Sequence, residues 1–349
     1  MTERFANAFG AHESGRGSAH SMQGVYRWLV AVVFLVYVLG AIGMYLWRGV
    51  TFRPDTWVLV LLVGALVLGR IQTFLIDWIP FVFLVFGYEL LRGIAGEIVT
   101  GGGLVGNRER SELPAVQVES LLRLDRALFA GHEPVSTLQS WLYTPDDPRW
   151  WDYLALVVYS LHFVLPCMFA FLLWLTARER FWHFTLALCL MTYTAFFAFL
   201  LFPAAPPWLA NSWGVVHDIQ WPAGSVVETI RIAPIRELDT LSIWKHASPD
   251  PVAAMPSLHA AFPWLVLLTG VRVFGWRGLW ALPYNVVLWF SVVYLANHWV
   301  IDVLAGIAWA TVAFLMMEGV WAVARERFGD RLSPTRSHAP PVTTLMQHG

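Results

Sequence analysis

Charge is scarce in this sequence. Only 13% of its 349 residues are charged and 57% are hydrophobic, whereas a soluble domain carries about 25% charged residues. So little charge cannot coat a water-facing surface, which excludes a soluble globular enzyme, and the hydrophobic content excludes a disordered chain. The net charge of -1 gives no electrostatic basis for binding nucleic acid, so no nucleic-acid partner is predicted.

Cysteine is scarce as well, and no internal repeat is visible. Cys167 and Cys189 both lie in apolar runs, so a disulfide framework does not organise the fold. The lack of a repeat gives no support to a two-fold transporter architecture. The sequence therefore predicts one membrane domain, residues 27–324, between a disordered cytoplasmic N-terminus (1–26) and a cytoplasmic C-terminal tail (325–349).

Long apolar runs, in contrast, are abundant. A transmembrane helix needs about 20 mostly apolar residues. Eight segments fit this pattern: 27–47, 56–76, 78–98, 151–175, 182–202, 257–273, 279–296 and 299–323. The first is too long for a cleavable signal and is interpreted as a signal anchor. The predicted fold is therefore all-α, a polytopic membrane helix bundle with about eight spans.

The arginines of the short connections predict how this bundle lies in a plasma (inner) membrane. They gather between spans four and five, between spans six and seven, and after span eight, and cytoplasmic loops carry such an excess. Both termini are then cytoplasmic, and the long connections 99–150 and 203–256 face outward. The first contains an amphipathic segment, 121–129, which predicts a short interfacial helix. We expect an active site on this outer, extracytoplasmic face.

Three ionisable residues in the last third of the chain are candidates for chemistry, because such side chains are costly within membrane spans and are usually functional. His259 follows Pro256, a residue type favoured in the first turn of a helix. Asn297 is a suitable N-cap, which predicts His298 in the first turn of the last span. Asp302 is four residues further on and shares a helix face with His298. The alternating directions of the spans bring both histidines to one membrane face.

This arrangement favours phosphoryl transfer. Two helix N-termini with free N–H groups favour an anion such as phosphate. The carboxylate of Asp302 would fix the tautomer of His298 and raise the basicity of its other nitrogen, as a nucleophile requires. His259, when protonated, would donate to the leaving oxygen. Arg92, near the outer end of span three, would place positive charge at the phosphate oxygens.

Other interpretations of these residues stay open. Two histidines and an acid can form an iron site, but the anion-binding helix ends oppose a cation, so no metal and no cofactor are predicted. Arg92 can instead pair with Glu89 or Glu97 on its own helix. His162, about 16 Å into span four, is at least equally well explained as a structural histidine.

Two motifs resemble those of the type 2 phosphatidic acid phosphatase superfamily. They are Pro-Ser-Leu-His, which ends at His259, and His-x-x-x-Asp-Val-Leu-Ala-Gly, which begins at His298. The resemblance implies a helical bundle that hydrolyses or transfers phosphomonoesters through a phosphohistidine without a metal. It further implies a role for each motif residue: His298 as nucleophile, Asp302 as its partner, His259 as general acid and Ser257 as a phosphate-binding residue.

Further segments are similar to one branch, the inositol phosphorylceramide synthases and their bacterial relatives. These segments are Phe202-Pro203-x-x-Pro206-Pro207-Trp208, Tyr88-x-x-x-Arg92-Gly93 and Tyr159-Ser160-x-His162-Phe163. The usual first motif of the superfamily, Lys-x6-Arg-Pro, is absent. The candidate substrate and phosphate contacts are accordingly Arg92, Ser257, Tyr88, Asn297 and Lys245.

The predicted function is that of a membrane lipid phosphotransferase or phosphatase. It would move a phospho-headgroup, similar to inositol phosphate, between a lipid and a small alcohol or water. A polyprenyl or phosphatidate-type lipid phosphate hydrolase is the alternative within this class, and a non-catalytic lipid transporter or binding protein is the alternative outside it. The His–Asp pair beside a second histidine favours catalysis, because binding alone needs cations but no fixed tautomer.

Overall fold

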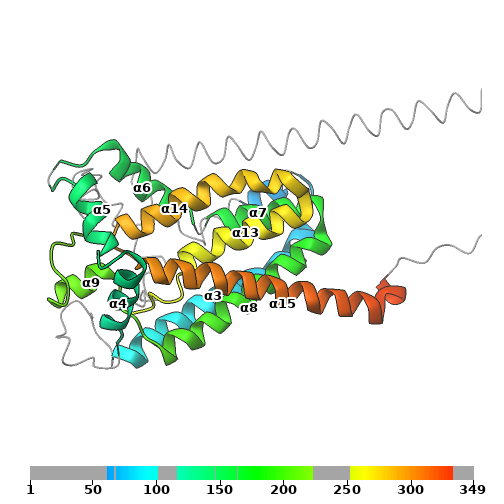
Figure 1. Ribbon diagram of the computed structural model, residues 1–349. Helices are drawn as coiled ribbons and strands as arrows, with labels where there is room; N and C mark the ends of the chain where they lie inside the picture. Colours follow the sequence, from blue (N-terminus) through cyan, green and yellow to red (C-terminus); the bar gives the residue numbers. More distant parts are fainter. Residues whose placement is uncertain are drawn as a thin grey trace, which may run out of the picture. The chain divides into compact units, whose positions relative to one another are not determined.

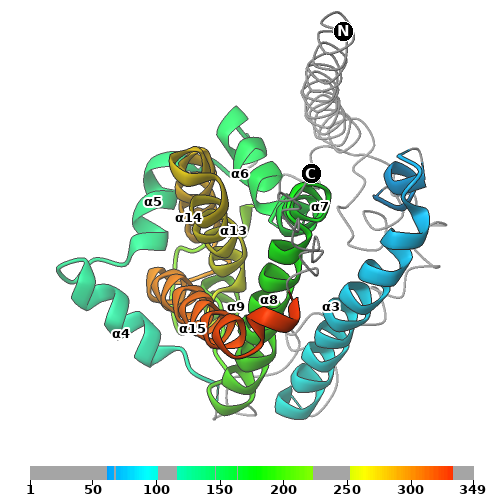
Figure 2. The ribbon, with the colours of Figure 1, turned by 90° about the vertical axis from the view of Figure 1, so that its right-hand side faces the viewer.

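The computed structural model describes residues 61–66, 68–100, 116–145, 147–162, 164–222 and 252–332. All of them belong to one compact unit. Over these ranges the named elements are all helical, and two isolated β-bridges join Gln117, Ala204 and Ala253. The helices, shown in Figures 1 and 2, are α3 (Ile71–Thr100), α4 (Glu119–Leu128), α5 (Pro134–Leu142), α6 (Trp150–Ser160), α7 (Val164–Thr176), α8 (Arg178–Leu201), α9 (Pro207–Ser212), α13 (Leu258–Phe274), the 3-10 helix η3 (Gly275–Ala281), α14 (Leu282–Tyr294) and α15 (Val300–Leu332).

Three helical runs of the described part are long and apolar enough to cross a membrane. They are Arg178–Leu201, Leu258–Tyr294, which takes in α13, η3 and α14, and Val300–Arg327. The bent pair α6 and α7, with 49° between its halves, makes a fourth if it is one span. The first predicted span, 27–47, lies outside the described residues. The all-helical prediction is confirmed for the described part, and the count of eight spans stays a prediction.

The second and third predicted spans are divided at a different place from the one expected. The sequence predicts a connection near Asp77, but the chain turns at 68–70, where Gly69 has a φ of 65°, and α3 then continues without interruption. Asp77 lies inside α3 and is buried. Its carboxylate accepts hydrogen bonds from Trp174 Nε1 at 2.8 Å and Arg178 Nε at 2.7 Å. A buried carboxylate with such partners does not need to lie in a loop.

Helices α13, α14 and α15 form the part of the bundle that carries the predicted chemistry. α13 packs against α14, α15, α7 and α8, and the elements run side by side in Figures 1 and 2. η3 turns back closely on α13, because a Cβ at Gly278 would lie 2.1 Å from the backbone nitrogen of Val271. At the end where α15 begins, α4 packs against α15 and α5 packs against α14.

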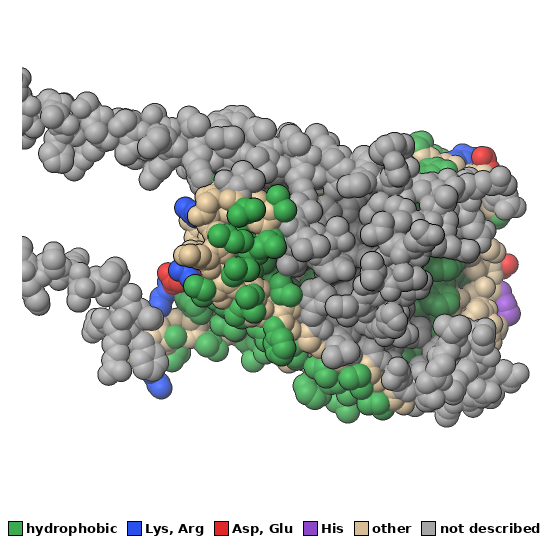
Figure 3. Space-filling model, turned by 180° about the vertical axis from the view of Figure 1, so that it is seen from behind, with side chains coloured by type: hydrophobic (Ala, Val, Ile, Leu, Met, Phe, Trp, Pro, Cys, Tyr) green, Lys and Arg blue, Asp and Glu red, His purple; other side chains and the backbone are tan. Residues whose placement is uncertain are grey.

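The outer surface supports membrane embedding. On the face in Figure 3, hydrophobic side chains make up much of the described surface, and the charged side chains that are visible lie toward its two ends. Large apolar side chains are exposed around the described bundle, among them Ile76, Phe83, Phe197, Leu201 and Leu315. A surface of this kind is stable when lipid, and not water, surrounds it.

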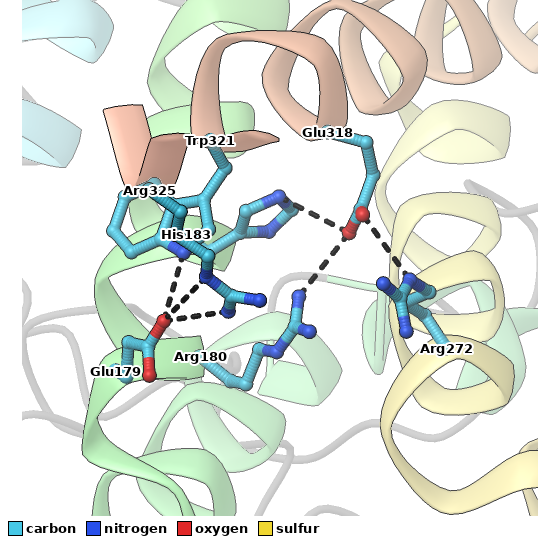
Figure 4. A network of polar contacts seen from close by, with 7 residues as sticks. All are labelled: Glu179, Arg180, His183, Arg272, Glu318, Trp321 and Arg325. Carbon is cyan, nitrogen blue, oxygen red and sulfur yellow. Dashed lines mark hydrogen bonds and ion pairs between the residues drawn. The ribbon is translucent and has the colours of Figure 1, made fainter. Parts of the chain in front are cut away.

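Three arginines from the three short connections of the orientation argument, Arg180, Arg272 and Arg325, lie together in the polar network shown in Figure 4. Glu318 of α15 contacts Arg180 at 3.3 Å, His183 at 3.2 Å and Arg272 at 3.1 Å. This network joins α8, α13 and α15. His259 lies at the other end of α13 from Arg272, a distance of about 20 Å at 1.5 Å per residue. This is about two-thirds of the roughly 30 Å hydrocarbon core of a membrane, so His259 and the network lie toward opposite ends of the bundle, and the sidedness itself stays a prediction.

Candidate active site

His259 lies at the N-terminal end of α13, as expected, but the start of this helix differs from the prediction. α13 begins at Leu258, and Ser257 is its N-cap. The Ser257 hydroxyl accepts a hydrogen bond from the backbone N–H of Ala260 at 3.3 Å. Pro256 therefore precedes the cap and is not part of the first turn. His259 is the second residue of the helix and is half-buried.

His298 lies just before α15, whereas the sequence predicts it in the first turn. α15 begins at Val300, so the prediction of Asn297 as N-cap is wrong. Ala296 has a φ of 59°, and the turn that it forms returns the N–H groups of Asn297 and His298 to the carbonyl of Val292 at 3.0 and 3.1 Å. His298 is thus fixed by a tight turn after α14.

The three predicted catalytic side chains meet at this end of the bundle. His298 Nε2 lies 2.8 Å from His259 Nδ1, and His298 Nδ1 lies 3.5 Å from Asp302 Oδ2. Asp302 is fully buried and His298 is 3% exposed. If Nδ1–H of His298 faces the carboxylate, its Nε2 carries the lone pair, and His259 Nδ1 is the donor of the contact between the two rings. That is the tautomer a nucleophilic histidine needs.

Tyr159 and His162 complete the surroundings of His259. The Tyr159 ring stacks on the His259 ring with centroids 4.8 Å apart, and the His162 ring lies 4.1 Å from it. His162 Nδ1 contacts the carbonyl of Tyr159. Arg92 is near enough for its charge to act on all three side chains. Arg92 as a phosphate contact stays a prediction, and His162, which sequence reasoning treated mainly as structural, lies directly against His259.

The start of α15 does not offer free N–H groups to a phosphate, contrary to the prediction. The N–H of Trp299 donates to Asp302 Oδ2 at 2.9 Å. The N–H groups of Val300 and Ile301 donate to the two carboxylate oxygens of Asp125 at 2.9 and 2.8 Å. Three successive donors are satisfied by carboxylates of the chain itself, so the N–H groups of Trp299, Val300 and Ile301 are not available to a phosphate.

Asp125 is the residue of this region that sequence reasoning missed. It lies on α4, within the predicted interfacial segment, and is fully buried beside Leu121 and Leu122. The pKa of its carboxyl is raised from 3.8 to about 6, mainly because burial disfavours the charged form. The two backbone hydrogen bonds oppose this rise, and the nearby carboxylates of Asp302 and Glu133 add to it. The available signal was its spacing of three and four residues from two leucines, which places it on the apolar face.

A close backbone contact sets the distance between α13 and α15. The N–H of Ser257 donates to the carbonyl of Asp302 at 3.0 Å, and a Cβ at Gly306 would lie 2.1 Å from the Ser257 carbonyl oxygen. Only glycine permits this approach. The contact holds the helix that carries His259 against the helix that follows His298.

The remaining predicted contacts stay predictions. Tyr88, one turn before Arg92, is 2% exposed and packs on Tyr193 of α8 with ring centroids 6.2 Å apart. Lys245 lies outside the described residues. Among the described residues, no group of three or more His, Cys, Asp and Glu is arranged to hold a metal ion.

The site thus consists of a histidine that is backed by a buried carboxylate and faces a second histidine, within a helical membrane bundle. The model of the PAP2 superfamily matches residues 119–316, more than half of the chain. The chain belongs to this superfamily and is an enzyme of the lipid phosphatase and phosphotransferase class.

Two curated proteins are similar to the chain. One is a phosphoinositol dihydroceramide synthase of Bacteroides thetaiotaomicron, 26% identical over 217 residues, which are 59% of this chain and 69% of that protein. The other is the inositol phosphorylceramide synthase catalytic subunit aur1 of Schizosaccharomyces pombe, 29% identical over 176 residues, 48% of this chain and 40% of that protein. The chain thus spans less than half of the yeast relative. No solved structure matches the chain.

Proposed function

We propose that this protein transfers a phospho-headgroup from a lipid to an alcohol through a phosphohistidine at His298. The observation that carries the proposal is the chain of contacts from Asp302 through His298 to His259. The two relatives, both named as synthases of inositol-phosphate-bearing ceramides, support inositol phosphate as the transferred group and a ceramide-like alcohol as the acceptor.

The reaction has two displacements at phosphorus. In the first, the lone pair of His298 Nε2 forms a bond to phosphorus, and the bond from phosphorus to the oxygen of the donor lipid breaks. His259 gives its proton to that oxygen, which leaves as an alcohol. In the second, the acceptor hydroxyl gives its proton to His259 and attacks phosphorus, and the P–N bond breaks. Asp302 stabilises His298 as positive charge develops on its ring.

The resting geometry requires His259 to move when substrate binds. Reacting atoms lie about 3–3.5 Å apart before attack, and His259 Nδ1 already occupies a position 2.8 Å from His298 Nε2. The phosphorus atom therefore has to take the place of His259 Nδ1. We infer that the His259–His298 contact protects the nucleophile in the empty site and opens on substrate binding.

Positive charge at the phosphate comes in this proposal from Arg92, because the first N–H groups of α15 are occupied. Ser257, Tyr88, Asn297 and Lys245 are proposed as further substrate contacts. No metal takes part, since the histidine pair supplies both the nucleophile and the acid. The site is proposed to face the extracytoplasmic side of a plasma (inner) membrane, where a lipid donor reaches it from the outer leaflet.

Product analysis tests the proposal. The purified protein is incubated in detergent with phosphatidylinositol labelled in its phosphate, with and without a ceramide, and with EDTA present. The expected product with ceramide is a labelled inositol-phosphate ceramide, formed at the same rate after EDTA. Release of soluble inositol phosphate in both reactions would identify a hydrolase. Activity that EDTA abolishes and Mg²⁺ or Zn²⁺ restores would contradict the metal-independent mechanism.

A further inference from the structure

Asp125 is an acidic residue on the buried face of an amphipathic helix. α4 exposes Arg123 and Arg126 and buries Leu121, Leu122 and Asp125. A carboxylate within an apolar face costs free energy unless hydrogen-bond donors satisfy it. The two backbone N–H groups that donate to it come from a segment about 175 residues further along the chain. Asp125 therefore holds that distant segment against α4.

The partners of Asp125 are the first two N–H groups of α15. Each carboxylate oxygen accepts one of them, from Ile301 at 2.8 Å and from Val300 at 2.9 Å. N–H groups in the first turn of a helix have no partner within the helix, and the helix dipole favours negative charge there. Asp125 therefore acts as an N-cap that another helix supplies.

The capped turn is the one that positions the nucleophile. His298 is two residues before Val300, and its backbone N–H is held by Val292 of α14 at 3.1 Å. Trp299, between them, is fully buried and donates from Nε1 to the carbonyl of Ala205 at 2.9 Å. His298 is thus fixed from α14 on one side and from α15 on the other, and Asp125 holds the α15 side.

We propose that Asp125 is a positioning residue for phosphoryl transfer: its carboxylate on the Val300 and Ile301 N–H groups fixes the start of α15 and with it the ring of His298. This inference deepens the proposed function and rests on it for the kinetic effect. It also gives α4 a role in the site, because the helix expected to lie on the membrane interface reaches into the catalytic turn.

The test compares Asp125→Asn with Glu119→Gln in the purified full-length protein. Asparagine keeps one acceptor oxygen and turns an N–H₂ group toward the second backbone N–H. Glu119 is an exposed carboxylate on the same helix, so its substitution removes the same charge from the exposed side of α4. The kinetic readouts are kcat and KM for phosphatidylinositol, and thermal unfolding shows that each variant is folded.

The expected result is a folded Asp125→Asn variant whose kcat falls by about 10²-fold, the cost of a catalytic group displaced by about 1 Å. KM is expected to change by less than about threefold, because Asp125 does not contact the substrate, and Glu119→Gln is expected to match the wild type. A folded Asp125→Asn variant with wild-type kcat overturns the proposal. So does a raised KM with unchanged kcat, which would make Asp125 a substrate-binding residue.

A second readout does not need activity. Imidazole ¹⁵N NMR of histidine-labelled protein, with the His298 signals identified from their absence in His298→Gln, reports the surroundings of this ring. Asp125→Asn should shift these signals, and Glu119→Gln should not. If the wild type transfers no phosphoryl group, the proposed function fails while this comparison still decides whether Asp125 positions His298. Unchanged His298 signals in Asp125→Asn overturn the proposal.

Discussion

Substitution of Gly306 by alanine separates the two catalytic helices. An ideal Cβ at this position lies 2.1 Å from the carbonyl oxygen of Ser257, where ordinary contact begins at 3.4 Å. The contacted atom is backbone, so no side-chain rotation relieves the overlap. The α13 start and α15 have to move apart by about 1 Å, which strains the hydrogen bond from Ser257 N–H to the Asp302 carbonyl.

This displacement predicts the size of the effect. His259 is two residues after Ser257, so the backbone that carries the proposed general acid is displaced relative to α15 and to the position from which His259 would reach the leaving oxygen. A misplacement of about 1 Å lowers catalytic rates by about 10²-fold, and inserting a methyl group into a packed interface costs about 1–3 kcal/mol of stability. We expect Gly306→Ala to show both losses together.

The assay measures kcat for headgroup transfer and the thermal unfolding midpoint in detergent. Gly319→Ala is the matched control, because it makes the same change in the same helix where no atom lies within 4 Å of the added Cβ. This control should keep wild-type kcat and a midpoint equal to or above that of the wild type, since alanine favours helix over glycine by about 1 kcal/mol. A wild-type kcat and a wild-type unfolding midpoint in Gly306→Ala would show that the close contact between Gly306 and Ser257 does not set the catalytic geometry.

The other predictions concern the carboxylate of Asp302, the pH dependence that Asp125 causes, and the membrane side on which the site lies. Asp302→Asn should lower kcat by about 10³–10⁴-fold, as loss of the orienting carboxylate does in serine triads, and a wild-type rate would contradict the assignment. The carboxyl of Asp125 has a pKa of about 6 in the folded protein, against an ordinary value of 3.8. Its contribution to the free energy of unfolding therefore changes as the pH passes between these two values. From pH 7 to pH 4 the free energy of unfolding should rise by about 2 kcal/mol relative to Asp125→Asn, while wild-type kcat falls as the cap is protonated. Denaturation and kinetic profiles measured in parallel for both proteins check this, and equal pH slopes would contradict it. Ser212→Cys should react with a membrane-impermeant thiol reagent on whole cells and Arg277→Cys should not; the reverse pattern would place the site in the cytoplasm.

The parts of the site that depend on local sequence were predictable. The pair His298 and Asp302 was expected from a spacing of four residues, and the structure brings the two side chains together. The pairing was expected because both residues would lie on one face of the last helix. This was only partly right, because His298 precedes the helix and is placed by the turn at Ala296. A positive φ at alanine is rare and is set by the packing around it, so composition gives no indication of it.

Helix boundaries were less predictable, because apolar content alone does not mark them. The segment 151–175 was expected as one span, but it is divided between α6 and α7. Pro166 was an available signal, since proline is tolerated in the first turn of a helix and disrupts its interior. The division matters for function because it places His162 against His259.

Contacts between distant segments could not be predicted from one sequence. Asp125 and Val300 are 175 residues apart, and no spacing rule connects them. The buried leucines around Asp125 indicate that it faces inward, but not which donors it meets. For the same reason, free N–H groups were wrongly expected at the start of α15, where a carboxylate from another helix already satisfies them.

The central claim is that His298 carries the transferred group. The direct measurement is to mix the purified protein with phosphatidylinositol in the absence of acceptor, quench the reaction under alkaline conditions that preserve phosphoramidate bonds, and map the modified residue by mass spectrometry. We expect an inositol-phosphate adduct on His298 that disappears when ceramide is added and never forms in His298→Ala. Transfer to ceramide by His298→Ala at the wild-type rate, with no adduct on any histidine of the wild type, would contradict it.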